Sequence, residues 1–167
     1  GNTNSVSTLY RYHLAVPVCA SVIRSVNKPV TDFQTTYDTI SFSPMPTNAQ
    51  VVSISLKLDT LIHTWPSDVI ATLTSTTTGR TDTLINRSGG NLLGDGFFNT
   101  VLNDSASKPI DSVYNPFTGT YKPYNPMYVF NQSYLNNQKF ILAIRDAANG
   151  DNGTLKRWTL NVCYFDV

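Results

Sequence analysis

Residues 51–59 read Val-Val-Ser-Ile-Ser-Leu-Lys-Leu-Asp and show the clearest secondary-structure pattern in the chain. Four apolar residues, Val52, Ile54, Leu56 and Leu58, alternate with Ser53, Ser55, Lys57 and Asp59. Successive side chains of a β-strand point to opposite faces of the sheet. The alternation therefore predicts a strand with one face in the core and the other in solvent.

Similar short patterns occur along the whole chain and favour an all-β protein. We expect further strands near residues 15–24, 37–42, 69–74, 82–85, 97–102, 127–130, 140–145 and 158–164. Turns are indicated at Thr78-Gly79, Gly89-Gly90, Gly94-Asp95-Gly96, Thr118-Gly119 and residues 149–153. No segment of ten or more residues keeps a helical period without interruption. The sequence therefore predicts an antiparallel β-sandwich of jelly-roll type with little or no helix.

The length and net charge of the chain indicate a single domain and argue against binding to nucleic acid. The 167 residues are sufficient for one domain spanning residues 1–167 with a substantial core. The net charge is +1 and charged residues make up only 14% of the chain, so no basic surface for nucleic acid is expected. No apolar run approaches the roughly 18 residues of a membrane span.

The two cysteines, Cys19 and Cys163, lie near opposite ends of the sequence. In each predicted strand the cysteine points away from the apolar face. The two thiols could meet if these strands are neighbours, and a secreted protein seldom leaves exposed thiols unpaired. We favour a disulfide over two free thiols.

Several motifs occur in an order and spacing that resemble a known family. They are His63-Thr-Trp-Pro-Ser-Asp68, Gly119-Thr-Tyr121-Lys-Pro123, Leu142-Ala-Ile-Arg-Asp146 and Gly150-Asp-Asn-Gly-Thr-Leu155. Together they resemble the P domain (P/Homo B domain) that follows the catalytic domain of kexin- and furin-like convertases and bacterial subtilisin-like proteases. The resemblance covers residues 37–164, and one departure is Asn137-Gln-Lys-Phe140, where the family usually has Gly-x-Trp.

The resemblance implies a non-catalytic accessory domain whose partner is the catalytic domain of a secreted protease. No signal peptide is present, so we expect a fragment of a longer secreted, extracellular or periplasmic protein. A free-standing adhesion module, or one that binds carbohydrate or peptide, is the alternative, because a fold does not determine a function.

Catalytic residues are scarce. Only His13 and His63 could exchange protons near neutral pH, and no Gly-x-Ser-x-Gly elbow is present. We expect His63 to be structural, bonding a loop at the strand end and holding Asp68 or its backbone. Trp158, in the last predicted strand, is likewise assigned a structural role.

One turn is rich in the oxygen ligands that Ca²⁺ prefers. Asp146, Asn149 and Asp151 lie close together in sequence, with glycines between them. The spacing is not that of an EF-hand, because the twelfth position counted from Asp146 is Arg157. Asp104 and Asp68 are further candidates, since they match acidic positions of the family's loops. The alternative is a turn whose side chains cap their own backbone.

Aromatic residues and prolines concentrate in residues 114–128. Tyr121 and Tyr124 could stack on sugar rings or on an extended peptide, and Trp65 could touch a partner domain. The alternative is an irregular crossover pinned to the sandwich by its rings.

Overall fold

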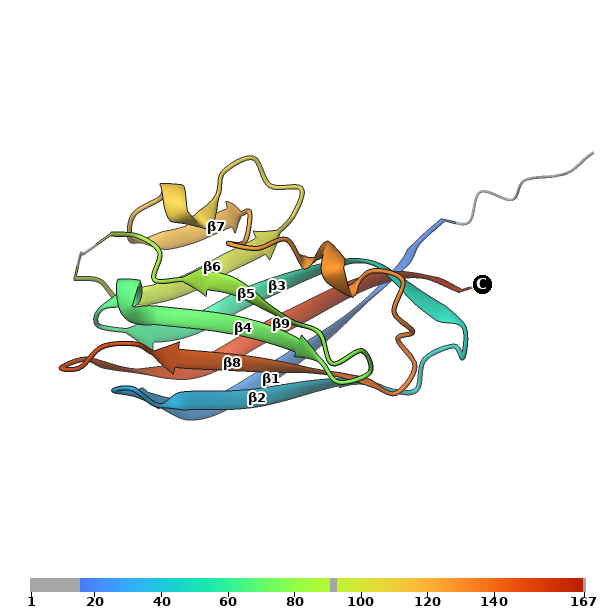
Figure 1. The fold of residues 1–167 in the computed structure, drawn as a ribbon, viewed down its shortest axis with the longest axis horizontal. Helices are drawn as coiled ribbons and strands as arrows, with labels where there is room; N and C mark the ends of the chain where they lie inside the picture. Colours follow the sequence, from blue (N-terminus) through green and yellow to red (C-terminus); the bar gives the residue numbers. More distant parts are fainter. Residues whose placement is uncertain (1–15, 91–92, 167) are drawn as a thin grey trace, which may run out of the picture.

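The computed structural model describes residues 16–90 and 93–166, and this part of the chain contains nine β-strands and three short 3₁₀-helices (Figure 1). The strands are β1 (Val18–Thr31), β2 (Thr35–Phe42), β3 (Ala49–His63), β4 (Val69–Ser75), β5 (Thr81–Asn86), β6 (Gly96–Asn103), β7 (Phe117–Tyr121), β8 (Gln138–Asp146) and β9 (Asn152–Asp166). The 3₁₀-helices are η1 (Pro66–Asp68), η2 (Ile110–Ser112) and η3 (Met127–Phe130). None of the helices in these described residues is long and apolar enough to cross a membrane.

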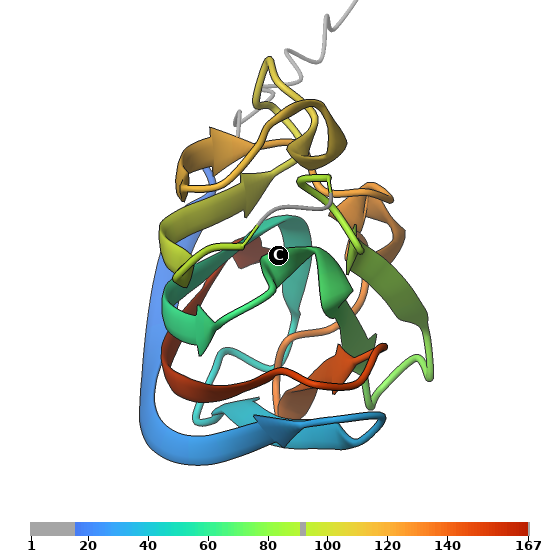
Figure 2. The ribbon, with the colours of Figure 1, turned by 90° about the vertical axis from the view of Figure 1, so that its left-hand side faces the viewer.

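The strands form two facing sheets, with neighbour order β1-β9-β3-β6-β7 in one and β2-β8-β4-β5 in the other (Figures 1 and 2). The antiparallel pairs are nested: β1 pairs with β9, β2 with β8, β3 with β6, and β4 with β5. Nested pairing that alternates between two sheets is the jelly-roll arrangement. The predicted all-β sandwich is confirmed, and β7 is an addition that pairs parallel to β6.

Irregularities in β3 change which side chains reach the core. Ile54, Leu56 and Leu58 are buried as predicted, but a register shift between Val51 and Ser53 takes Val52 off the buried face. Two more shifts, on either side of Thr60, cancel each other in the pairing with β9. Within this irregular stretch two consecutive residues, Asp59 and Thr60, lie off the buried face, so the buried positions pass from Leu58 to Leu61. His63 therefore points inward, where an unbroken period of two would turn it to solvent.

The core fills the space between the sheets with side chains from both. The largest fully buried residues include Trp158, Phe97, Phe117 and Phe140. The rings of Phe97 and Phe117 stack with their centroids 4.6 Å apart, and this contact joins β6 to β7. Phe140 packs edge-on against the rings of Phe42 and Phe130.

Two local predictions were wrong. Residues 127–130 form the 3₁₀-helix η3 and not a strand. Pro126 precedes this helix, and a turn of three residues places Met127 and Phe130 on the same buried side. Thr118-Gly119 is not a turn, because both residues lie inside β7, where Gly119 has a φ of 133°.

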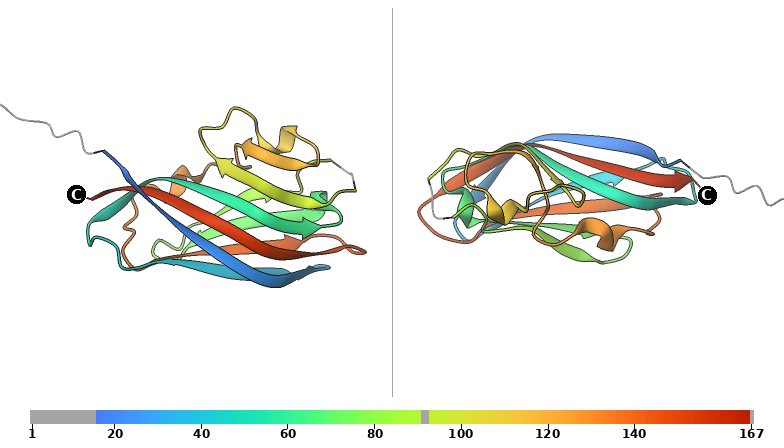
Figure 3. Two further views of the ribbon diagram at one scale, coloured as in Figure 1. Left: turned by 180° about the vertical axis from the view of Figure 1, so that it is seen from behind. Right: turned by 90° about the horizontal axis from the view of Figure 1, so that it is seen from above.

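Cys19 and Cys163 form a disulfide between β1 and β9. These two strands lie side by side, drawn in blue and red in Figure 3. The two cysteines are direct partners in the β1–β9 register, with their Cα atoms 4.0 Å apart. The predicted strand near residues 15–24 starts at Ala15, which lies outside the described residues, and the observed strand continues to Thr31. Pro29 is accommodated there because β1 is the edge strand of its sheet.

Candidate functional site

The two motif segments, residues 63–68 and 146–153, meet at one end of the sandwich. His63 ends β3 and Asp146 ends β8, and their side chains are both fully buried. The Nε2 atom of His63 lies 3.1 Å from Oδ2 of Asp146. Thr64 Oγ1 donates a 2.9 Å hydrogen bond to Oδ1 of Asp151. The motifs therefore form one continuous bonded cluster.

Both ring nitrogens of His63 are engaged. A carboxylate accepts only, so Nε2 carries the proton that it shares with Asp146. On the other side, Nδ1 lies 2.9 Å from the carbonyl oxygen of Trp65 and 3.2 Å from its backbone nitrogen. A buried imidazole bonded on both sides has no nitrogen left for a substrate. His13, the other predicted candidate, lies outside the described residues.

The prediction that His63 holds Asp68 is wrong. His63 does bond the loop after its strand, through Trp65, but its carboxylate partner is Asp146. The Asp68 carboxylate instead accepts a 2.9 Å hydrogen bond from Arg87. The Asp68 backbone oxygen accepts one from the nitrogen of Ala147, which ties η1 to the end of β8.

Gly153 allows β9 to pass this cluster closely. A Cβ atom at position 153 would lie 2.1 Å from the carbonyl oxygen of Ile62 and 2.8 Å from Cδ2 of His63. No side chain fits there without moving the backbone of β3. Gly153 therefore allows β9 to pack closely against β3 at His63.

The five candidate calcium ligands are distributed over separate environments. Asp146 bonds His63 and also accepts from the backbone nitrogen of Ala148. Asp68 pairs with Arg87, while Asp104 accepts from the backbone nitrogen of Met127. Asp151 and Asn149 remain at the β8–β9 loop, where Asn149 is exposed.

Within residues 16–90 and 93–166, no three His, Cys, Asp or Glu side chains are placed to share a metal ion. The nearest arrangement is a hollow of about 240 Å³ lined by Asp32 and Asp151 together with Thr31 and Asn152. Asp32, at the end of β1, also accepts a hydrogen bond from the nitrogen of Gly150. The sequence did not indicate Asp32, because it lies 119 positions before Asp151. Calcium binding stays a prediction, with this hollow as its best location.

The aromatic candidates have different exposures. Tyr121 is buried and its hydroxyl donates to the carbonyl oxygen of Thr118, so its ring cannot stack on a ligand. Trp65 is half-buried beside His63. Tyr124 is 47% exposed and lines a hollow of about 280 Å³ with Asp104 and Lys122.

A second buried polar cluster, centred on Asp38 in β2, was missed by the sequence reading. Arg24 donates to both carboxylate oxygens at 3.0 Å, and Lys28 lies 2.9 Å away. Trp158 Nε1 donates a third bond of 2.7 Å. Burial raises the pKa of Asp38, but the hydrogen bonds from Arg24, Lys28 and Trp158 outweigh it and hold the pKa well below its ordinary value. We assign this cluster a structural role, because the buried carboxylate is bonded by residues from β1 and β9 of the facing sheet.

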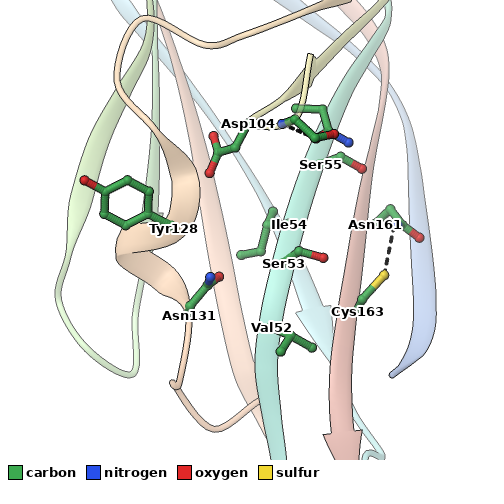
Figure 4. Close-up of a pocket in the computed structure, with 11 residues that line it drawn as sticks. Val52, Ser53, Ile54, Ser55, Asp104, Tyr128, Asn131, Asn161 and Cys163 are labelled. Carbon is green, nitrogen blue, oxygen red and sulfur yellow. Dashed lines mark hydrogen bonds between the residues drawn. The ribbon is translucent and has the colours of Figure 1, made fainter. Parts of the chain in front are cut away.

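A hollow of about 450 Å³ lies beside β3 at the other end of the sandwich (Figure 4). Tyr128 and Asn131 approach it from η3, and Asp104 follows the end of β6. Ser53, Ser55 and Asn161 line its opposite side. This hollow is separate from the histidine cluster, and Asp104 is the candidate calcium ligand that lines it.

Comparison with known proteins gives no family assignment. No family model matches the sequence, and no curated protein matches it. Among solved structures, the crystal structure of a serine protease of Aeromonas sobria aligns with 92% of this chain at 14% identity and a TM-score of 0.49. The structure of that protease in complex with the chaperone ORF2 aligns with 93% at 14% identity and a TM-score of 0.48. This chain spans 28% of the length of each matched chain.

Proposed function

We propose that this chain is a non-catalytic accessory domain, similar to the P domains, that supports the folding and stability of an adjacent subtilisin-like serine protease domain in a secreted protein. The observation that carries this proposal is the meeting of residues 63–68 with residues 146–153. These segments carry the resemblance, and they are joined by the His63–Asp146 and Thr64–Asp151 contacts. The motif residues thus serve to connect β3, η1, β8 and β9.

The state of His63 supports the absence of catalysis. A general base must be within reach of the proton that it abstracts from the substrate. His63 is fully buried and bonded at both nitrogens, so it does not meet this requirement. The domain therefore acts through its surface.

The outer face of the β2-β8-β4-β5 sheet is the surface that we assign to the catalytic domain. A hollow of about 400 Å³ there is lined by Tyr37, Ile70, Ile141 and Ala143, with threonines around them. Tyr37 is 59% exposed, and Arg145 is the one charged residue among the described residues of this lining. The central part of a protein interface is poor in charge and rich in aromatic side chains. An accessory domain that binds the catalytic domain only in its folded state raises the stability of the catalytic domain.

The test is to express the parent protein from its complete reading frame and to compare Tyr37→Asp with Tyr128→Asp. Both tyrosines are exposed, but Tyr128 lies on η3, away from this face. We expect Tyr37→Asp to shorten the half-life of protease activity several-fold at elevated temperature, and Tyr128→Asp to leave it unchanged. A reading frame without subtilisin-type Asp, His and Ser motifs would overturn the proposal, as would peptide-bond cleavage by this domain alone.

A further inference from the structure

The hollow beside β3 exists because this strand has no neighbour along a short part of one edge (Figure 4). β6 pairs with β3 as far as the Ser55–Asn103 pair. The chain rejoins β3 at Val51, which bonds Gln132 and Ser133, and at the Gln50–Tyr134 bridge. Residues 52–54 between these points face the hollow.

The polar groups of this hollow have unused hydrogen-bonding capacity. Asp104 uses Oδ1 to accept from the nitrogen of Met127, and no described residue bonds its second oxygen. The oxygen Oδ1 of Asn131 is screened from solvent and has no partner among the described residues. The hydroxyls of Ser53 and Ser55 likewise have no hydrogen-bond partner within the described part of the chain. Ser53, Ser55 and Asp104 are at least partly exposed, so their free oxygens can bond the hydroxyl groups of a ligand.

Two hollows share Asp104, and each of them contains an exposed tyrosine. This residue lines both the hollow beside β3 and the neighbouring hollow of about 280 Å³. Tyr128, 63% exposed, belongs to the first hollow, and Tyr124, 47% exposed, belongs to the second. The two hollows therefore adjoin at a carboxylate, with one ring available in each.

We propose that these adjoining hollows bind a neutral oligosaccharide. Sugar hydroxyls both donate and accept, which matches amide, hydroxyl and carboxylate side chains, and the C–H face of a pyranose ring packs against an aromatic ring. Among its described lining residues, the larger hollow contains no Lys, Arg or His to attract an anionic sugar. Lys122 is the cation of the smaller hollow.

The shape of the hollow favours a sugar over an extended peptide. A peptide that adds to a sheet needs a free edge several residues long. Here the free edge is limited to residues 52–54, since Asn103 closes one end and Gln132 the other. A compact ligand unit fits such a space, whereas a continuous strand does not.

The test is binding of the isolated chain to an array of neutral oligosaccharides, with sialylated and sulfated glycans and a random peptide library as parallel arms. For the best neutral glycan, calorimetry should show affinity reduced about tenfold or more by Tyr128→Ala. Ser53→Trp should block the hollow and abolish binding, and because Ser53 is exposed this variant does not disturb the core. Tyr114→Ala, at an exposed tyrosine that lines neither hollow, should bind like the wild type.

The proposal is overturned if no neutral glycan binds, if only charged glycans or peptides bind, or if Ser53→Trp binds as tightly as the wild type. Melting curves of each variant show whether the fold is intact. If Tyr128→Ala is unstable, Ser53→Trp decides the outcome.

Discussion

Trp158 Nε1 donates a 2.7 Å hydrogen bond to Oδ2 of Asp38, so β9 of one sheet is bonded to β2 of the other. The Asp38 side chain is 1% exposed, and Arg24 and Lys28 of β1 neutralise it. A carboxylate buried without such partners would be strongly unfavourable. The bond therefore fixes how β1, β2 and β9 pack at the edge where the two sheets meet.

Replacing this carboxylate should weaken the fold. We expect Asp38→Asn to lower the free energy of unfolding by about 2 kcal/mol, because it removes the charge that strengthens the bonds from Arg24 and Trp158. Urea denaturation followed by tryptophan fluorescence measures the change. Asp166→Asn, an exposed carboxylate at the end of β9, is the control and should have no measurable effect.

The same carboxylate predicts a defined pH dependence. The pKa of Asp38 is lower in the folded protein than the value of about 4 expected in the unfolded chain. The unfolded state therefore binds the proton first as the pH falls, and the stability that Asp38 contributes is present above about pH 4 and decreases below it. The difference between wild type and Asp38→Asn should be constant from pH 7 to about pH 5 and shrink toward pH 2. A difference that is independent of pH over this range would contradict the assignment.

The disulfide should be a main source of stability. Cys19 and Cys163 are 144 positions apart, so the bond closes nearly the whole described chain into a loop. In the chain-entropy model, a loop of this length stabilises by about 4–5 kcal/mol. We expect Cys19→Ala combined with Cys163→Ala to lower the melting temperature strongly, and a reducing agent to have the same effect on the wild type. Equal melting curves with and without reductant would show that the bond is absent in solution.

The His63–Asp146 pair should be needed for folding and not for chemistry. His63→Ala leaves the Asp146 carboxylate buried without its partner, which costs about 3–5 kcal/mol. Asp146→Asn keeps an oxygen that can accept from Nε2 of His63 and should cost less. Chemical denaturation of both variants checks this order, and the reverse order would show that the charge of Asp146 matters more than the imidazole.

The sequence predicted the parts of the fold that depend on local pattern. Alternating apolar residues located β3, β8 and β9 and indicated the all-β sandwich. Strand β7 was not predicted, because its five residues include Gly119 and lie between prolines. The inward orientation of His63 was not predicted either, since it depends on an irregular stretch at Asp59 and Thr60 that no residue type marks.

The site could be predicted only where its residues are neighbours in the sequence. Asp38 and Trp158 are 120 positions apart, and nothing near Asp38 in the sequence indicates a buried charge. For the same reason, the partners of the further calcium candidates were not predicted: the Asp68 carboxylate bonds Arg87, and the Asp104 carboxylate bonds the backbone of Met127. Tyr121 looked available for stacking, but the parallel pairing of β7 with β6 buries it.

Calcium binding, if it occurs, should be at the β8–β9 loop and should involve Asp32 as well as Asp151. These carboxylates line one hollow with the backbone and side chains of Thr31 and Asn152, and hard cations prefer such oxygen ligands. A cation present at 100 times its dissociation constant stabilises the folded state by about 2.7 kcal/mol. We therefore expect EDTA to lower the melting temperature and added Ca²⁺ to restore it. Asp151→Ala should melt like the EDTA-treated wild type and no longer respond to Ca²⁺, whereas Asp104→Asn, a candidate outside this loop, should keep the response. A melting curve that EDTA leaves unchanged would remove the metal from the description of this domain.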